Sequence, residues 1–359
     1  MKFLRGMFDR VRPSFEEGGG LRPLKPVFDA TENFFFASSA RTQDAPHIRD
    51  PLDLKRFMSM VIIGLAPCVL ASFYFFGLRM LAMIVVSYAA GGAVEMLFAV
   101  VRKEDINEGF LVTGLIFPLI LPPGLPLWLV AVGVAFGVLV GKEVFGGTGR
   151  NPFNPALVGR CFLVVGYPKA MAITYVVPGS GTWGRLTEYV GVDAMTTATP
   201  LAGASKGLFA PIGDMFWGGV TGSAGETSAI AIIAGGIFLL LTRVANWRTV
   251  VGILGSFTVL GVVLQHFNPE NFAKVHWHLL AGGLLFGAFF MATDPVTSPV
   301  TNGGKWVYAM IIGAVTLLIR NLAGYAEGMM FAILLGNIAA PVIDDAAVRI
   351  RLRRLQHEG

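Results

Sequence analysis

About ten apolar segments, separated by short polar stretches, most constrain the fold of this 359-residue chain. Hydrophobic residues make up 54% of the sequence, charged residues make up 14%, and the mean hydropathy is +0.65. Soluble domains carry roughly 25% charged residues, so these values exclude an ordinary soluble protein and predict an integral membrane protein. The segments lie at residues 57–77, 80–101, 110–122, 125–141, 155–168, 229–242, 249–266, 278–292, 306–320 and 328–343.

Several segments are shorter than the roughly 20 residues that a membrane-spanning helix needs. Those at 110–122 (FLVTGLIFPLILP) and 155–168 (PALVGRCFLVVGYP) also contain Pro, Gly or Arg. Interrupted helices are tolerated within a bilayer where the freed backbone groups are buried in protein or line a cavity. We therefore expect broken or tilted helices and a site inside the bundle.

The distribution of Lys and Arg predicts the orientation. Ten of the 28 precede the first apolar segment, and four arginines, at 349, 351, 353 and 354, follow the last one. Because short cytoplasmic segments are enriched in Lys and Arg, both termini are predicted to be cytoplasmic. An even number of spans then places the longest connection, residues 169–228, on the outer side.

Three regions follow from this pattern. They are a cytoplasmic N-terminal extension at 1–56, a transmembrane domain at 57–344 that carries the outer connection, and a basic cytoplasmic tail at 345–359. The charged N-terminus lacks the apolar core and cleavage site of a secretory signal peptide. Cys68 and Cys161 lie in apolar segments, and two cysteines cannot by themselves hold an iron–sulfur cluster.

Two long stretches share one internal order, an apolar run, a Pro-containing break and a second apolar run. They are GLIFPLILPPGLPLWLVAVGVAFGVLV from Gly114 and GLLFGAFFMATDPVTSPVTNGGKWVYAMIIGAVTLLI from Gly283. An odd number of spans separates them, so the copies would be inverted in the membrane, as in transporters whose sites lie at the repeat interface. Chance similarity between Gly- and Leu-rich helices is the alternative.

Carboxylates inside or beside the apolar segments are candidate functional groups, because a charge in hydrocarbon is costly. Glu95 follows the pair Gly91 and Gly92, whose missing side chains leave a groove for a flat headgroup or for a neighbouring helix. Other acidic residues lie at the ends of apolar segments, namely Glu226, Asp294, Asp344 and Asp345. Such carboxylates suit Na⁺ and suit helix capping equally well, so they do not identify an ion.

Two polar stretches lie beside the bundle. In KEVFGGTGRNPFNPALVGR, Asn151 and Asn154 offer donors and acceptors that suit the edge of a uracil or isoalloxazine ring, although the spacing of a P-loop or dinucleotide motif is absent. In VDAMTTATPLAG, hydroxyl side chains follow Asp193, at Thr196, Thr197 and Thr199. These residue types close turns and cap helices, and a hydroxyl cluster is also a candidate for covalent modification.

Nearly the whole chain resembles the family that contains the B subunit of Na⁺-translocating NADH:quinone oxidoreductases and, more distantly, the D subunit of Rnf ferredoxin:NAD⁺ complexes. The matching stretches are HIRDPLDLKRFM, GGAVEMLFAV, INEGFLVTG, KEVFGGTGRNPFNPALVGR, HWHLLAGGLLFGAFFMATDPV, TNGGKWVYA and EGMMFAILLGNIAAPVID. The N-terminal extension and the tail RIRLRRL favour the Na⁺-pumping member. The resemblance implies an all-α polytopic membrane protein with about ten transmembrane helices in two inverted repeats with broken helices, similar to urea transporters.

DAMTTAT is similar to the flavin-transfer motif of this family. The resemblance implies that a flavin transferase joins the phosphate of FMN to the hydroxyl of Thr199 as a phosphoester. Ala194 and Thr197 depart from the residues usual in the motif, and Thr196 and Thr197 are the alternative acceptors. The position of Thr199 after Ala198 favours Thr199, and the outer placement of this loop agrees with modification on the periplasmic side of a bacterial inner membrane.

The resemblance also carries over further residues by position. Asn151 and Asn154 match the segment near which the family binds noncovalent riboflavin. A quinone- and inhibitor-sensitive helix corresponds to Gly91, Gly92 and Glu95. Acidic positions implicated in Na⁺ uptake correspond to Glu95, Asp294 and Asp344. Each of these residues also has an ordinary packing or capping role.

The function implied is electron relay from covalent FMN through riboflavin to ubiquinone, coupled to Na⁺ translocation. The expected partners are the other members of a six-subunit complex, especially the FMN-bearing C subunit and the NADH-oxidising F subunit, together with a flavin transferase and membrane lipid, and no nucleic acid. Three alternatives remain open: an Rnf-type subunit of a ferredoxin:NAD⁺ oxidoreductase, a flavin-free urea-type channel or transporter, and a purely structural subunit. Fold alone does not separate them.

Overall fold

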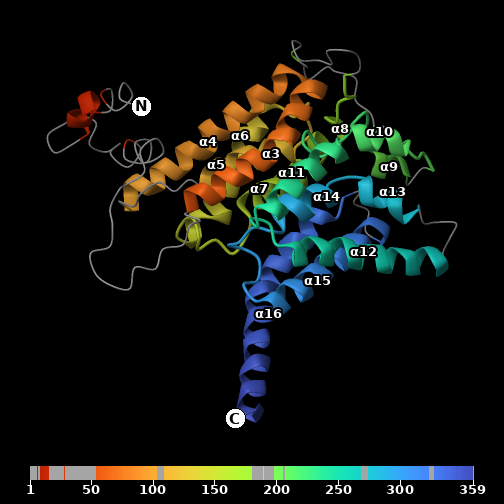
Figure 1. Ribbon diagram of the computed structural model, residues 1–359. Helices are drawn as coiled ribbons and strands as arrows, with labels where there is room; N and C mark the ends of the chain where they lie inside the picture. Colours follow the sequence, from red (N-terminus) through yellow and green to blue (C-terminus); the bar gives the residue numbers. More distant parts are fainter. Residues whose placement is uncertain are drawn as a thin grey trace.

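The structure of the protein is a computed structural model that describes residues 6, 9–15, 28, 54–102, 109–179, 189, 198–204, 207–267, 274–322 and 327–358. The regular secondary structure of these residues is helical (Figure 1). The elements are η1 (Arg12–Ser14), α3 (Leu54–Phe76), α4 (Leu78–Arg102), α5 (Gly109–Leu119), α6 (Leu127–Gly141), η3 (Glu143–Phe145), α7 (Pro155–Gly166), α8 (Pro168–Ile173), α9 (Pro200–Ala204), α10 (Ile212–Trp217), α11 (Ala229–Leu241), α12 (Trp247–Phe267), α13 (Val275–Leu280), α14 (Leu284–Phe286), η4 (Gly287–Met291), α15 (Asn302–Leu322) and α16 (Met329–Glu358).

Among the described residues, six helices are long and apolar enough to cross a membrane: α3, α4, α6 with η3, α12, α15 and α16. Three shorter apolar helices, α5, α7 and α11, lie among them. The apolar segment predicted at 278–292 is divided between α13, α14 and η4. The prediction of an all-α polytopic membrane protein with broken helices is therefore confirmed.

The break after α5 shows how an interrupted helix is accommodated. Pro122 and Pro123 have no backbone N–H group, so the helix cannot continue through them. The carbonyl of Leu119 instead accepts a hydrogen bond from the N–H of Gly225 at 2.7 Å, and that of Leu121 accepts one from Ala224 at 3.0 Å. The segment before α11 thus pairs with the backbone groups that the break leaves free.

The same packing relations occur in both halves of the chain. In the first half α4 packs against α5 and α6, and α6 packs against α7. In the second half α12 packs against α13 and α15, and α15 packs against α16. The halves meet where α3 packs on α11, and the carbonyl of Gly64 leaves no room for a Cβ atom at Gly235. This recurrence supports the two repeats expected from the sequence.

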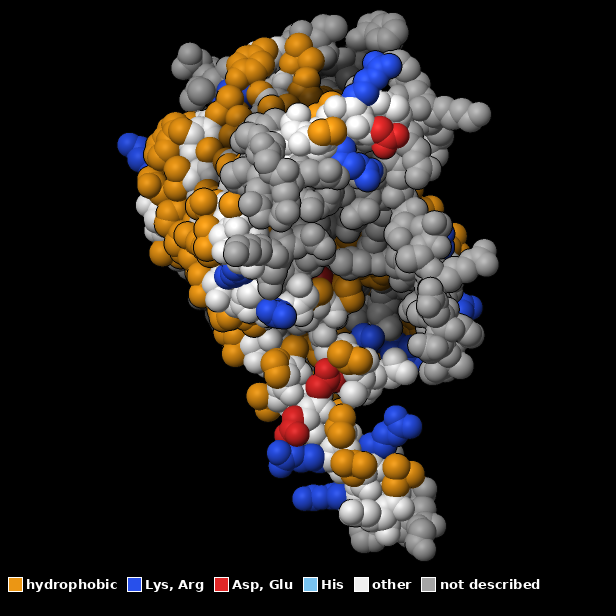
Figure 2. All heavy atoms as spheres, turned by 90° about the vertical axis from the view of Figure 1, so that its left-hand side faces the viewer, with side chains coloured by type: hydrophobic (Ala, Val, Ile, Leu, Met, Phe, Trp, Pro, Cys, Tyr) orange, Lys and Arg blue, Asp and Glu red, His pale blue; other side chains and the backbone are white. Residues whose placement is uncertain are grey.

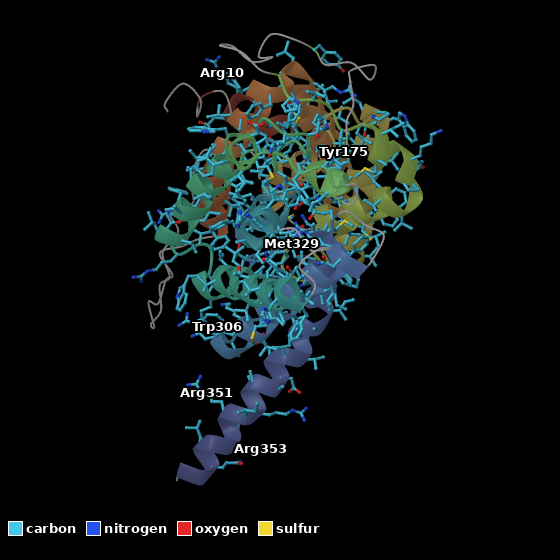
Figure 3. The ribbon with its side chains drawn as sticks, turned by 90° about the vertical axis from the view of Figure 1, so that its right-hand side faces the viewer. Arg10, Tyr175, Trp306, Met329, Arg351 and Arg353 are labelled. Atoms are coloured by element: carbon cyan, nitrogen blue, oxygen red, sulfur yellow. The ribbon has the colours of Figure 1, made fainter. Side chains whose placement is uncertain are left out.

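Helix α16 extends well beyond the bundle and ends in the C-terminus (Figure 1). Charged and apolar side chains are interspersed along this projecting end, whereas apolar side chains cover a broad flank of the bundle (Figure 2). Arg351 and Arg353 lie on the projecting end, far from Tyr175 and Met329 in the bundle (Figure 3). The boundary expected after residue 344 therefore falls inside a continuous helix, because nothing in the sequence from 345 to 358 ends it.

Candidate functional site

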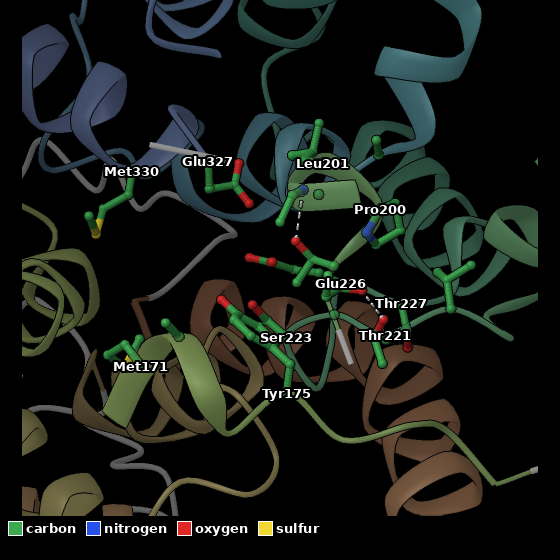
Figure 4. Close-up of a pocket in the computed structure, with 18 of the residues that line it drawn as sticks. Met171, Tyr175, Pro200, Leu201, Thr221, Ser223, Glu226, Thr227, Glu327 and Met330 are labelled. Atoms are coloured by element: carbon green, nitrogen blue, oxygen red, sulfur yellow. Dashed lines mark hydrogen bonds between the residues drawn. The ribbon is translucent and has the colours of Figure 1, made fainter. Parts of the chain in front are cut away.

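A cavity of about 410 Å³, here called the outer cavity after the predicted side of the 169–228 connection, lies beside the C-terminal half of α7, the start of α9 and the start of α16 (Figure 4). Apolar side chains form most of its wall. The polar side chains that line it are those of Arg160, Tyr175, Thr199, Thr221, Ser223, Glu226, Thr227 and Glu327. Ligand pockets usually measure about 300–1,000 Å³ and combine apolar walls with a few polar groups, so this cavity has the size and character of a ligand site.

Thr199 is placed at the outer cavity by the start of α9. Its Oγ1 accepts a hydrogen bond from the N–H of Ala202 at 3.3 Å, and Pro200 follows it as the first helical residue. The hydroxyl of Thr221 donates to the carbonyl of Ala198 at 2.8 Å and holds the preceding residue in place. Helix capping therefore presents the Thr199 hydroxyl to the cavity, while the side chain remains partly exposed.

A buried ion pair lies in the wall of the outer cavity. Arg160 Nη1 donates to Glu226 Oε1 at 3.0 Å, and Nη2 donates to Ser223 Oγ at 3.3 Å. The two charged side chains are only 5% and 2% exposed. A charge pair withdrawn from water is tolerated when it is also hydrogen-bonded, and here Ser223 supplies such a bond. Arg160 Nε is buried without a hydrogen-bond partner among the described residues.

A second ion pair fixes another part of the same wall. Arg320 Nη2 lies 3.4 Å from Glu327 Oε1, and the same guanidinium donates to the carbonyls of His278 at 2.8 Å and Ala281 at 2.9 Å. Glu327 Oε2 accepts from the N–H of Gly283 at 2.8 Å. These bonds hold the turn between α13 and α14 against the start of α16, which closes the cavity on that side.

A smaller pocket of about 70 Å³, here called the inner pocket, lies at the opposite, N-terminal end of α7. It brings together three of the predicted residues, Asn151, Asn154 and Asp294, with Lys142. Asn154 and Arg160 are six positions apart on α7, which corresponds to about 9 Å along the helix axis. One short helix therefore separates the two spaces.

The asparagines of the inner pocket are engaged in local structure. Asn154 Oδ1 accepts from the N–H of Ala156 at 3.1 Å and caps α7. Asn151 Oδ1 accepts from the N–H of Gly149 at 3.2 Å, and its Nδ2 donates to the carbonyl of Phe153 at 3.0 Å. The pocket is also well below the roughly 300 Å³ of ligand pockets. In this shape the pocket is smaller than usual ligand pockets, and the riboflavin site predicted at these two asparagines stays a prediction.

Glu95 and the glycines before it are packed rather than open. Lys142 Nζ donates to Glu95 Oε1 at 2.8 Å, and both side chains are buried. The ring of Phe110 lies against Gly91 and Gly92, where a Cβ atom on Gly91 would be 2.7 Å from it. The groove expected beside this glycine pair is therefore filled, and the helix-packing alternative describes these residues in this structure.

Two of the three acidic residues predicted for Na⁺, Asp294 and Asp344, accept hydrogen bonds from backbone groups. Asp294 accepts from the N–H of Val296 at 3.2 Å, and Asp344 accepts from the N–H groups of Val300 at 2.6 Å and Thr301 at 3.0 Å. Within the part of the chain that the structure describes, no three acidic, His or Cys side chains gather as a metal site. Three motif residues, Asp193, Thr196 and Thr197, lie outside the described residues.

Comparison with known proteins identifies the family. A sequence profile of the NQR2, RnfD, RnfE family matches residues 41–352. The chain belongs to this family. The B subunit of the Na⁺-translocating NADH-quinone reductase of Azotobacter vinelandii is 37% identical over 403 residues, covering 98% of each chain. The protein of the same name from Ectopseudomonas mendocina is 37% identical over 406 residues with the same coverage. That of Klebsiella pneumoniae strain 342 is 35% identical over 416 residues, covering 99% of this chain and all of the relative.

For this member of the NQR2, RnfD, RnfE family, sequence reasoning missed the pairing of Arg160 with Glu226. Each residue is conspicuous alone, since Arg160 interrupts an apolar segment and Glu226 lies just before the apolar segment at 229–242. They are 66 positions apart, so no local spacing connects them. The sequence did carry one signal: a charge buried in a membrane protein is costly, so Arg160 needs an opposite charge nearby.

Proposed function

We propose that the chain is the B subunit of a Na⁺-translocating NADH-quinone reductase and that it carries FMN on Thr199. Relatives that bear this name match it over nearly their full lengths. The observation that carries the flavin proposal is the position of Thr199. The residue is partly exposed and lines a cavity of about 410 Å³.

The outer cavity suits an isoalloxazine ring, which has two apolar faces and a polar edge. Apolar residues such as Met171, Leu201 and Met330 form its walls, and Arg160 keeps a buried Nε without a described partner. When bound, a flavin supplies the electron-transfer chemistry that the side chains themselves lack. The protein holds the attachment oxygen at a fixed place, covers the ring with apolar groups and supplies charged groups beside it.

In this proposal the outer connection lies in the periplasm and both termini lie in the cytoplasm. Electrons come from other members of the complex, with the C and F subunits as the expected neighbours, and ubiquinone is the acceptor. Electron transfer is coupled to Na⁺ translocation. The buried pair of Glu95 with Lys142 and the carboxylate of Asp294 lie near the inner end of α7, where a coupled ion would enter.

Fluorescence of the denatured protein on a gel tests the flavin proposal. The full chain, expressed with the rest of the complex in a host that contains a flavin transferase, should give a fluorescent band. Thr199→Ala should give a dark band, while Thr199→Ser keeps a hydroxyl and should retain part of the fluorescence. Thr227→Val is the matched control, because it removes another hydroxyl of the same cavity, one that has no hydrogen-bond partner among the described residues, and it should leave the band fluorescent.

A dark wild-type band, or a Thr199→Ala band as bright as wild type, would overturn the proposal. The first result would favour the flavin-free channel or a purely structural role in the complex. The second would move the attachment to another hydroxyl, and the neighbouring threonines 196 and 197 would be substituted next.

A further inference from the structure

We propose that the Arg160–Glu226 ion pair positions the flavin ring in the outer cavity and sets its reduction potential. This inference rests on the proposed attachment of FMN at Thr199. It assigns a role to two buried charges that neither the attachment motif nor the family comparison explains.

The placement of the pair is the first argument. Arg160 and Glu226 line the same 410 Å³ cavity as Thr199, and a ring that fills this cavity therefore contacts its charged wall. Among the described lining residues, Arg160 is the one cation, opposed by the carboxylates of Glu226 and Glu327. The cation comes from α7 in the first half of the chain, and both carboxylates come from the second half.

Electrostatics in a buried site gives the second argument. Charges interact more strongly in the low-dielectric interior than in water. Reduction of the ring adds an electron taken from a reduced cofactor of a neighbouring protein in the complex, which is oxidised, and no bond to the protein forms or breaks. A cation beside the ring favours the added charge, and a carboxylate disfavours it. Arg160 and Glu226 should therefore move the potential in opposite directions.

A purely structural role is the competing explanation, since Arg160 also ties α7 to the segment before α11 through Glu226 and Ser223. A purely structural ion pair predicts a lower free energy of unfolding when either partner is removed. It does not predict potential shifts of opposite sign. The chain also contains an Arg–Glu ion pair that lies away from the cavity, Arg102–Glu143, with an N–O distance of 3.1 Å and an arginine side chain that is 28% exposed.

The experiment is a spectroelectrochemical titration of the covalent flavin in the assembled complex. Arg160→Gln should lower the midpoint potential, and Glu226→Gln should raise it. Each shift should correspond to at least a tenfold change in the reduction equilibrium, about 59 mV for one electron. Arg160→Lys keeps the charge and should restore most of the wild-type potential. Arg102→Gln, the matched control, should leave the potential unchanged.

Gel fluorescence on the same samples separates the two proposals. A wild-type band without covalent flavin overturns the proposed function. A fluorescent band with the same potential in wild type, Arg160→Gln and Glu226→Gln overturns only this inference. Shifts of the same sign in both variants also overturn it. If Arg160→Gln does not fold, Glu226→Gln decides the question, because an unchanged potential in that variant contradicts the proposal.

Discussion

Polar residues lie toward both ends of α7, but the two sets differ in their hydrogen-bond partners and in the size of the space that they line. At the inner end, Asn151 and Asn154 direct their side-chain oxygens to backbone N–H groups beside a pocket of about 70 Å³. At the outer end, Arg160 lines a cavity of about 410 Å³ and keeps a buried donor atom without a partner among the described residues. A buried polar atom without a described partner lies beside each space, Thr148 Oγ1 at the inner pocket and Arg160 Nε at the outer cavity, so the size of the space is what distinguishes the ligand site.

The largest expected effect tests the charged wall of the outer cavity. Glu226→Ala should lower the free energy of unfolding by about 3–5 kcal/mol, because it leaves the buried Arg160 charge uncompensated. Denaturant unfolding of the purified complex in detergent measures this. Asp345→Ala is the control, since its pair with Arg349 is largely exposed and should contribute about 0–1 kcal/mol. Equal losses in the two variants would contradict the assignment of Glu226 to a buried pair.

Overpacking the same wall should have the next largest effect. A Cβ atom at Gly283 would lie 2.6 Å from Glu226 Oε1, so Gly283→Ala must displace the carboxylate. We expect a loss of about 1–3 kcal/mol in the free energy of unfolding, the usual cost of an overpacked core. Gly255→Ala places its methyl group in open space within α12 and should be neutral or slightly stabilising. An unchanged free energy of unfolding in Gly283→Ala would show that the wall has room for the added methyl group.

The inner pocket is tested by two substitutions at one position. Asn154→Ala removes the cap of α7 and should cost about 0.5–2 kcal/mol, whereas Asn154→Asp retains a capping oxygen and should restore the stability. Noncovalent flavin content, measured after extraction, should be the same in Asn154→Asp as in wild type. If the noncovalent flavin content falls in both variants, the amide itself binds a flavin and the inner end of α7 is a second ligand site.

The smallest effect is expected at Asp344, where a carboxylate predicted for Na⁺ instead accepts hydrogen bonds before α15. Asp344 accepts with both carboxylate oxygens and an Asn amide keeps only one acceptor, so Asp344→Asn should lower the free energy of unfolding by about 0.5–1 kcal/mol. The Na⁺ dependence of quinone reduction should also remain as in wild type. A higher Na⁺ requirement in Asp344→Asn would restore this residue to the ion path.

Periodicity and composition predicted the fold well, because apolar length and interrupting Pro residues report directly on membrane spans. They did not predict that the tail continues α16, since basic residues are compatible with both a helix and a flexible end. Thr199 was predicted from a local motif, and the structure places it beside the outer cavity. The pair of Arg160 with Glu226 was not, because contact between distant positions depends on how the two halves pack. Glycines 91 and 92 suggested a groove, and only the position of Phe110 shows that it is filled.

The mass spectrum of the proteolytic peptide that contains Thr199, from the complex in a host with the transferase, decides whether this residue carries FMN. We expect a peptide heavier than its bare sequence by FMN less one water, with fragment ions that place the addition on Thr199. A bare peptide from a fully assembled and active complex would contradict it.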